Sequence, residues 1–420
     1  MSEATLAAPT PEATAASIER AGGVAASVAA PALAERPAKR PRVADEAPSN
    51  PEAKRKVALL LAYNGAQFQG LQKNPGATTV EQALEDAIHA CGGISDANYE
   101  AGYQKVSWSR AGRTDKGVHA VGQLIGLKMV LHNDDADPDP MVARVNAELA
   151  RGAHAVRILA VARATNGFCA HSGCSSREYE YLLPACALRP AGSAHGDGTT
   201  APTAAELERL RGLLAKLEGT HSFHNLSDGK LTPGDKQAQR YIKGTSVGEP
   251  VRVAAAGSDA VDATDAADGV GEAAYFVPVR FHGQSFLLHQ IRKMVALIVA
   301  VARGDAPEAA IHHHLTAARA GRALPLAPGC ALTLRRCWYE QYERRRPADK
   351  PSLHFDDAAV AAQDAFLNEH IRPHIAARER AGEFREWLAA IEGHAWEAEV
   401  QVAPPTETAP SAVELANSDV

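Results

Sequence analysis

The sequence predicts an α+β fold in which two similar, β-rich halves share one sheet. Short apolar or alternating segments typical of strands recur along the chain, and helix-periodic segments with capping signals lie between them. The two kinds of segment follow a similar order in both halves. A length of 420 residues fits two domain-sized units with additional segments. With 45% hydrophobic and 22% charged residues, the chain has the composition of a globular protein that buries a sizeable core.

In the first half, residues 54–167, each element has a local signal. Val57–Tyr63 is a short apolar run that predicts a buried strand, closed by a turn at Asn64-Gly65. A helix is predicted to follow, opened by a capping box of Thr79 and Gln82 and ended by Gly92-Gly93. Two further segments are expected to form strands: Val118–Val130 and Val156–Ala164.

The second half, residues 168–347, repeats this order. Strands are predicted at Glu178–Leu183 and Tyr275–Phe281. Thr203 with Glu206 predicts a helix that ends before Gly219, and another helix is expected to start near Ser285 and to end at Gly304. The segments near 191–201 and 249–272 are interpreted as surface insertions. Residues 348–420 form an acidic C-terminal extension with one predicted amphipathic helix, Phe384–Ile391.

The first 53 residues are rich in Ala, Pro and Glu, lack apolar periodicity and are predicted to be a disordered tail. The tail carries the basic cluster Arg36–Arg42, and a second cluster, Lys54–Lys56, follows it. This pair of clusters favours a nuclear address. Additional mitochondrial or cytoplasmic pools are left open, although the acidic residues of the tail disfavour a mitochondrial presequence.

Several functional classes are disfavoured. The best candidate for a membrane span, Met294–Ala302, is far shorter than the about 18 apolar residues that a span needs, so a soluble protein is expected. The six cysteines include no CxxC pair and are expected to be reduced thiols of an intracellular protein. His312–His314 are consecutive, and consecutive helical residues point about 100° apart, so they are not predicted to bind a metal together.

The net charge of −6 conceals an uneven distribution. Residues 54–347 hold 34 basic and 29 acidic residues, whereas residues 348–420 hold 5 basic and 14 acidic residues. A basic body with acidic appendages is compatible with a polyanionic partner.

The segment Ser109–Ala120, with the sequence SRAGRTDKGVHA, contains the densest group of chemically active residues. In extended backbone, residues i and i+2 project to the same side, so Arg113 is expected to lie beside Asp115 and to keep its carboxylate ionised and oriented.

This segment resembles the catalytic motif of the TruA-like tRNA pseudouridine synthases, and that of the eukaryotic tRNA pseudouridine synthase 1 branch most closely. The resemblance covers roughly residues 55–343. It extends to five further segments. Tyr63–Gln72 resembles the family's opening Tyr-x-Gly motif, Arg177–Tyr181 its Arg-x-Tyr strand, and Gly219–Asn225 its loop after the helix of the second half. Gly283–Met294 resembles the family's third motif and Leu324–Leu332 its last motif.

The resemblance implies a pseudouridine synthase fold with a mixed, mainly antiparallel sheet, flanking helices and a catalytic cleft between the halves. It implies an isomerase that converts uridines in tRNA to pseudouridine through an aspartate nucleophile and a flipped-out base, with no cofactor and no metal. The expected catalytic residues are Asp115, Arg113, Tyr179 and Arg292, and the expected substrate-binding residues are Tyr179, Leu332, Lys116 and Arg110.

Two other functions are compatible with parts of the pattern. One is a catalytically inactive RNA-binding or RNA-chaperone protein on the same fold, which is disfavoured because Asp115 and Arg113 are both present. The other is a metal hydrolase that uses the histidines, which the ligand geometry disfavours. The sequence leaves open which uridines are modified and whether mRNA or small nuclear RNA is also a substrate. It also leaves open the oligomeric state and whether the aspartate attacks the ribose or the base.

Overall fold

The structure, a computed structural model, describes residues 54–131, 140–152, 154–190, 192–193, 198–254, 273–349, 352–353 and 355–396. The predicted tail 1–53, most of the 249–272 insertion and residues 397–420 lie outside these ranges. Within the described residues, no helix is long and apolar enough to cross a membrane.

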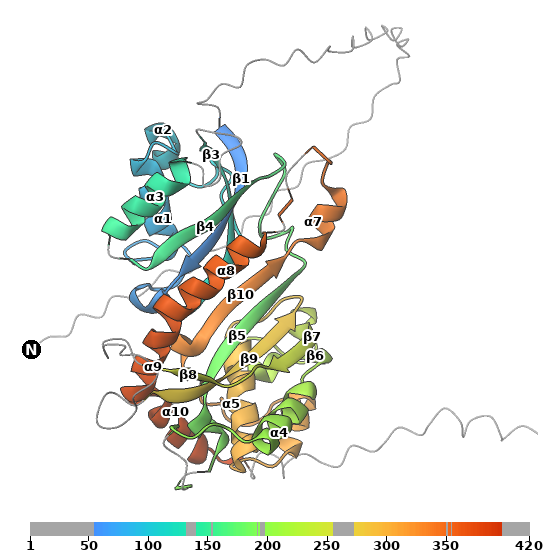
Figure 1. The fold of residues 1–420 in the computed structure, drawn as a ribbon. Coiled ribbons are helices and arrows are strands. Elements are labelled where there is room, and N and C mark those ends of the chain that lie inside the picture. Colours follow the sequence, from blue (N-terminus) through green and yellow to red (C-terminus); the bar gives the residue numbers. More distant parts are fainter. Residues whose placement is uncertain are drawn as a thin grey trace, which may run out of the picture. The chain divides into compact units, whose positions relative to one another are not determined.

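Ten strands form one sheet in the order β4-β1-β3-β10-β5-β9-β7-β6, with β2 on β3 and β8 on β9 (Figure 1). All pairs are antiparallel except β3 with β10, which are parallel and join the two halves. This confirms the mixed, mainly antiparallel sheet. The strands are β1 (Lys54–Tyr63), β2 (Ser109–Arg110), β3 (His119–Val130), β4 (Val156–Arg163), β5 (Ser176–Pro184), β6 (Gly219–Ser222), β7 (Gln239–Val247), β8 (Val251–Val253), β9 (Ala274–Gly283) and β10 (Leu332–Trp338).

Helices flank both faces of this sheet. Those described are α1 (Val80–Ala90), α2 (Asp96–Glu100), α3 (Pro140–Arg151), α4 (Ala204–Ala215), α5 (Gln290–Arg303), α6 (Ala309–Thr316), α7 (Glu340–Arg345), α8 (Asp357–Phe366), α9 (Arg372–Arg380) and α10 (Glu383–Glu392), with a π-helical segment, Leu367–Ile371, between α8 and α9. Alternation along β1 shows how the faces divide. Leu59 and Leu61 belong to the larger core, with α1, α3, α4 and α5, whereas Ala58 and Leu60 belong to a smaller core with Ala359 of α8.

Most predicted elements of the two halves are confirmed, and the differences have local causes. Strand β1 begins at Lys54, so the second basic cluster is part of the sheet, and Lys56 is buried with its Nζ donating to the Ser107 carbonyl at 2.8 Å. Thr203 and Glu206 form a complete capping box, whereas Thr79 caps α1 without a reciprocal bond from Gln82.

The helix predicted near Ser285 begins instead at Gln290, because His289 has a left-handed backbone (φ 66°) that cannot continue a helix. As a result Leu288 lies outside the helix and is exposed.

The C-terminal segment 355–396 is part of the same folded body. Helix α10 confirms the predicted helix at Phe384–Ile391, but α8, the π-helical segment and α9 were not predicted. Apolar side chains of the π-helical segment, α9 and α10 enter the main core, where Ile371, Ile375 and Phe384 are fully or almost fully buried. Figure 1 shows α8 lying across the sheet.

Candidate active site

The predicted catalytic loop, Ala111–Val118, connects β2 to β3 and ends in a tight turn. The Val118 amide donates to the Asp115 carbonyl at 3.1 Å, and Gly117 supplies the positive φ that the turn requires (76°). Thr114 points inward, where a hydrogen bond of 2.7 Å joins its hydroxyl to that of buried Tyr63. Asp115 points the other way, and about a third of its side chain (34%) is exposed.

The opening motif packs against this loop and fixes its backbone. The Leu71 amide donates to the Thr114 carbonyl at 3.1 Å. A Cβ on Gly65 would lie 2.1 Å from the Val118 carbonyl oxygen, and a Cβ on Gly70 would lie 2.9 Å from the Thr114 carbonyl oxygen. Glycine at both positions therefore allows the two segments to approach closely.

Asp115 lies on the wall of an open cavity of about 550 Å³, a size suited to a nucleotide. Of the eleven lining residues, four were predicted as site residues: Arg113, Asp115, Lys116 and Arg292. The others are Gln69, Gly70, Gln72, Lys73, Asn74, Thr114 and His289. Asp115 is the only acidic side chain in this lining, which also holds four Lys or Arg residues, so the cavity suits an anionic ligand.

The ion pair expected between Arg113 and Asp115 is not formed, and Arg292 does not replace Arg113 in it. Among the described residues, neither Arg113 nor Arg292 has a nitrogen within 4.0 Å of its carboxylate, and Arg113 and Lys116 are exposed without an ionic partner. The one basic group at that distance is His289, whose Nε2 lies 4.0 Å from Asp115 Oδ2.

Arg292 is anchored on the first turn of α5. Its Nε donates to the Ala327 carbonyl at 2.5 Å, and the guanidinium lies 3.5 Å from where a Cβ of Gly329 would stand. Burial lowers the pKa of Arg292, while Tyr181 and Asp115 oppose that shift. The side chain therefore presents a fixed positive charge to the cavity that contains Asp115.

Tyr179 lies on β5, between Phe281 of β9 and Leu334 of β10 in register. It is buried, its ring meets Phe286 edge to face at 5.4 Å, and its hydroxyl lies 3.7 Å from the Cβ position of Gly112 in the catalytic loop. Burial raises the pKa of Tyr179, with Arg177 acting in the opposite direction. The phenol is therefore protonated at neutral pH.

Three of the four predicted substrate-binding residues do not line the cavity, and buried Tyr179 is one of them. Leu332 is buried at the start of β10, opposite Tyr181. Arg110 donates through Nε to Glu81 at 2.5 Å, and Glu81 is fully buried and also accepts from Trp108. The charge of Arg110 is thus used to neutralise a buried carboxylate, which differs from its predicted contact with substrate.

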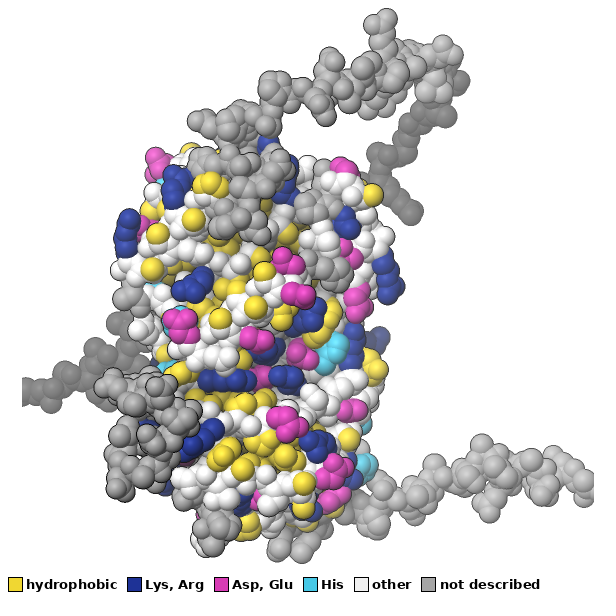
Figure 2. All heavy atoms as spheres, in the orientation of Figure 1, with side chains coloured by type: hydrophobic (Ala, Val, Ile, Leu, Met, Phe, Trp, Pro, Cys, Tyr) yellow, Lys and Arg dark blue, Asp and Glu magenta, His cyan; other side chains and the backbone are white. Residues whose placement is uncertain are grey.

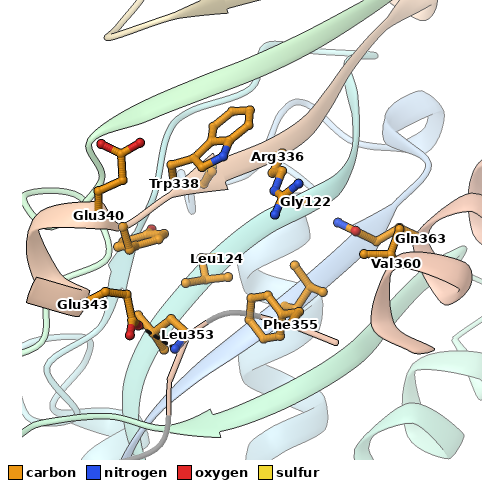
Figure 3. Close-up of a pocket in the computed structure, with 13 residues that line it drawn as sticks. Gly122, Leu124, Arg336, Trp338, Glu340, Glu343, Leu353, Phe355, Val360 and Gln363 are labelled. Carbon is orange, nitrogen blue, oxygen red and sulfur yellow. Dashed lines mark hydrogen bonds between the residues drawn. The ribbon is translucent and has the colours of Figure 1, made fainter. Parts of the chain in front are cut away.

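A second pocket lies beside the smaller core, between β3, β10 and the segment with Leu353 and Phe355 (Figure 3). It holds only about 40 Å³, little more than one water molecule. Two carboxylates line it, Glu340 and Glu343, and Glu343 already accepts hydrogen bonds from Arg346, Ser352 and the Leu353 amide. This pocket is therefore unsuited to a nucleotide.

The face of the molecule shown in Figure 2 carries intermingled basic and acidic side chains rather than a uniformly basic surface. Several arginines are already paired with a carboxylate: Arg280, Arg335 and Arg372 lie 3.0, 4.0 and 3.9 Å from oxygens of buried Glu180. These arginines are partly neutralised, unlike Arg113 and Lys116 at the cavity.

No group of three or more potential metal ligands occurs among the described residues. Within the triple-histidine run, His312 is exposed, whereas His313 and His314 are buried. All six cysteines are free thiols.

Comparison with known proteins identifies the family. A family model described as tRNA pseudouridine synthase matches residues 213–340. The chain is 34% identical over 366 residues to Pseudouridylate synthase 1 homolog from Mus musculus, covering 86% of this chain and 79% of the mouse protein. The corresponding human protein is 35% identical over a region that covers 80% of this chain and 73% of the human protein. The tRNA pseudouridine(27/28) synthase of Saccharomyces cerevisiae is 30% identical over a region that covers 68% of this chain and 85% of the yeast protein. The chain therefore belongs to the TruA-like family of tRNA pseudouridine synthases, which are isomerases.

Proposed function

We propose that this protein converts specific uridines in tRNA to pseudouridine, with Asp115 as the nucleophile. The observation that carries the proposal is the position of Asp115: it is the single acidic side chain on the wall of a nucleotide-sized cavity lined by Lys and Arg residues. The names of the relatives, which specify pseudouridylate or tRNA pseudouridine synthases, support the same substrate class.

The reaction breaks the C1′–N1 bond of uridine, turns the uracil and joins C1′ to C5. The proton on C5 leaves and N1 gains one, so substrate and product are isomers and neither an oxidant nor a cofactor is consumed. An aspartate carboxylate is ionised at neutral pH and can attack either C1′ of the ribose or the base. The uridine has to leave its stack before either attack can occur.

The remaining site residues have distinct proposed roles. Arg113 and Lys116, exposed at the cavity and without ionic partners among the described residues, bind phosphates next to the flipped nucleotide. Arg292 supplies the fixed positive charge opposite the nucleophile. Tyr179 and Leu332 form the apolar support of the base. Both are buried and neither lines the cavity, so access to them requires that Phe286 or the catalytic loop shifts when RNA binds.

The direct test is to incubate the purified protein with tRNA transcripts that contain only unmodified nucleosides and to map pseudouridine at each position. We expect a small set of positions to be converted. Full tRNA binding with no conversion in any transcript would instead support a non-catalytic RNA-binding protein.

Salt dependence tests the phosphate contacts. Each phosphate contact contributes about −0.7 to −0.9 to the slope of log affinity against log salt. Arg113→Gln and Lys116→Gln should each reduce the magnitude of the slope by the amount that one contact contributes, about 0.7 to 0.9. Arg211→Gln is the matched control, because Arg211 is an exposed arginine paired with Glu208 on α4, away from the cavity. Equal slopes for all three variants would exclude the proposed phosphate contacts.

We also propose that the protein is imported into the nucleus through the basic cluster Arg36–Arg42. Replacing the four basic residues of this cluster by alanine should move a fluorescent fusion of the full chain out of the nucleus. Unchanged nuclear signal would exclude this segment as the address.

A further inference from the structure

His289 has an unusual backbone for its position. Among the described residues, His289 (φ 66°) and Ser107 (φ 51°) are the two non-glycine residues with positive φ. Such conformations cost free energy, and they concentrate at functional sites where surrounding structure enforces them. At His289 the left-handed backbone delays the start of α5 and sets the direction of the side chain.

The imidazole is turned into the cavity. His289 lines it together with Asp115, and about a third of each side chain is exposed, so both are accessible to a ligand. Nε2 of His289 lies 4.0 Å from Oδ2 of Asp115, and neither ring nitrogen has a hydrogen bond to a described residue. The ring therefore has an unused donor next to the carboxylate.

The other charged groups near Asp115 are less well placed for this contact. Arg292 is held by the Ala327 carbonyl, and Arg113 has no nitrogen within 4.0 Å of the carboxylate. Asp228 lies within electrostatic reach of His289 but does not line the cavity.

From this geometry we infer that His289 is the positioning residue for the nucleophile: its Nε2–H donates to one oxygen of Asp115 when a nucleotide fills the cavity, and the other oxygen is left free to attack. The inference rests on the proposed function and adds to it the group that orients Asp115. A shift of about 1 Å closes the contact to hydrogen-bond length, and catalytic hydrogen bonds are often long in the absence of substrate.

The test distinguishes the contribution of the imidazole ring from that of the left-handed backbone conformation. His289→Gly removes the imidazole but adopts the left-handed conformation freely, and His289→Asn tolerates that conformation and retains a donor. Ser107→Gly is the matched control, since it makes the same change at an exposed left-handed residue outside the cavity.

Single-turnover rate constants and tRNA affinities are measured separately. We expect His289→Gly to lower the rate constant by about 10- to 100-fold, the scale of a misplaced reactive group, with Kd for tRNA changed less than about threefold. His289→Asn should fall between wild type and His289→Gly, and Ser107→Gly should match wild type. Added imidazole should partly restore the rate constant of His289→Gly but should not change that of Asp115→Ala.

A wild-type rate constant for His289→Gly would overturn the inference while leaving the proposed function intact. Equal losses in His289→Gly and Ser107→Gly, without rescue by imidazole, would also overturn it, because a general backbone effect would then explain both. A wild-type protein that forms no pseudouridine in tRNA would overturn the proposed function, and this inference with it.

Discussion

The buried imidazole of His119 accepts a hydrogen bond from the Gly65 amide at its Nδ1, over 2.9 Å. Its Nε2 donates to the Cys330 carbonyl at 2.7 Å. An amide N–H can only donate and a carbonyl can only accept, so the ring is the neutral tautomer with hydrogen on Nε2. One side chain thus joins the opening motif, the start of β3 and the segment before β10, all of which surround the catalytic loop.

This arrangement predicts a specific acid sensitivity. Burial lowers the pKa of His119 to about 3, with His374 adding to the shift and the Cys330 hydrogen bond opposing it. Below the ordinary histidine pKa of about 6.5, His119 is protonated in the unfolded chain but stays neutral in the folded protein. Stability is therefore lost as the pH falls from 6.5 toward 3.

His119→Asn removes this titration. At pH 7 the variant should be less stable than wild type by about 1–3 kcal/mol, because one buried hydrogen bond is lost. Between pH 6.5 and pH 4 the advantage of wild type should shrink by about 3 kcal/mol. Denaturant unfolding across this range measures the difference, and a difference that does not change with pH would exclude a neutral, buried His119.

Gly70 and Gly76 allow the loop contact to be tested with a matched pair. Both have positive φ (104° and 76°), but a Cβ on Gly70 would lie 2.9 Å from the Thr114 carbonyl oxygen, whereas nothing lies within 4 Å of a Cβ on Gly76. Gly76→Ala should cost about 1–2 kcal/mol of stability and leave the rate constant unchanged. Gly70→Ala should cost more and lower the rate constant at least about tenfold, because Asp115 moves with Thr114. Identical activities in the two variants would count against this coupling.

The C-terminal helices are predicted to be required for an ordered site. Asn64 Nδ2 donates to the His370 carbonyl at 2.7 Å, and the His374 ring meets His119 at 5.5 Å, so the segment contacts the opening motif and β3 directly. Truncation after residue 354 exposes several large apolar side chains and should abolish cooperative thermal unfolding. Truncation after residue 396 removes none of the described contacts and should retain the wild-type melting temperature and rate. A stable, active protein ending at residue 354 would show that the helices are dispensable.

Tyr179 is predicted to act through both its ring and its hydroxyl. Tyr179→Phe keeps the ring, so tRNA affinity should be retained. Turnover should slow, because the protonated hydroxyl relays the C5 proton: its oxygen receives that proton as its own proton passes to solvent. Replacement of hydrogen by deuterium at C5 of the substrate uridine should then slow the turnover of Tyr179→Phe more than that of wild type. Tyr179→Leu should also weaken binding by about 1–3 kcal/mol through lost stacking. Wild-type turnover in Tyr179→Phe, without an isotope effect, would restrict Tyr179 to a stacking role.

The features that were predictable from the sequence depend on neighbouring residues. The strand at Val57–Tyr63 and the capping box at Thr203 follow from local patterns of apolar and capping residues. For the same reason the catalytic loop could be recognised before the structure was known.

The features that were not predictable depend on distant contacts or on the backbone. Arg110 appeared to be free to bind RNA because its partner, Glu81, is 29 residues away in the sequence. His289 lies within a recognised motif, but its proposed role rests on a positive φ that residue type alone does not indicate. The acidic composition of residues 348–420 suggested a separate extension, whereas a few buried residues such as Ile371 and Ile375 determine that the segment packs on the core.

The central claim, that Asp115 is the nucleophile, is tested most directly by the rate of tritium release from tRNA labelled at C5 of uridine. Asp115→Ala should reduce this rate by at least about 10⁴-fold, the scale observed when a nucleophile is removed. Affinity for tRNA should remain close to that of wild type, because the phosphate contacts are unaffected. A variant that binds tRNA normally and releases tritium at a tenth of the wild-type rate would contradict the assignment.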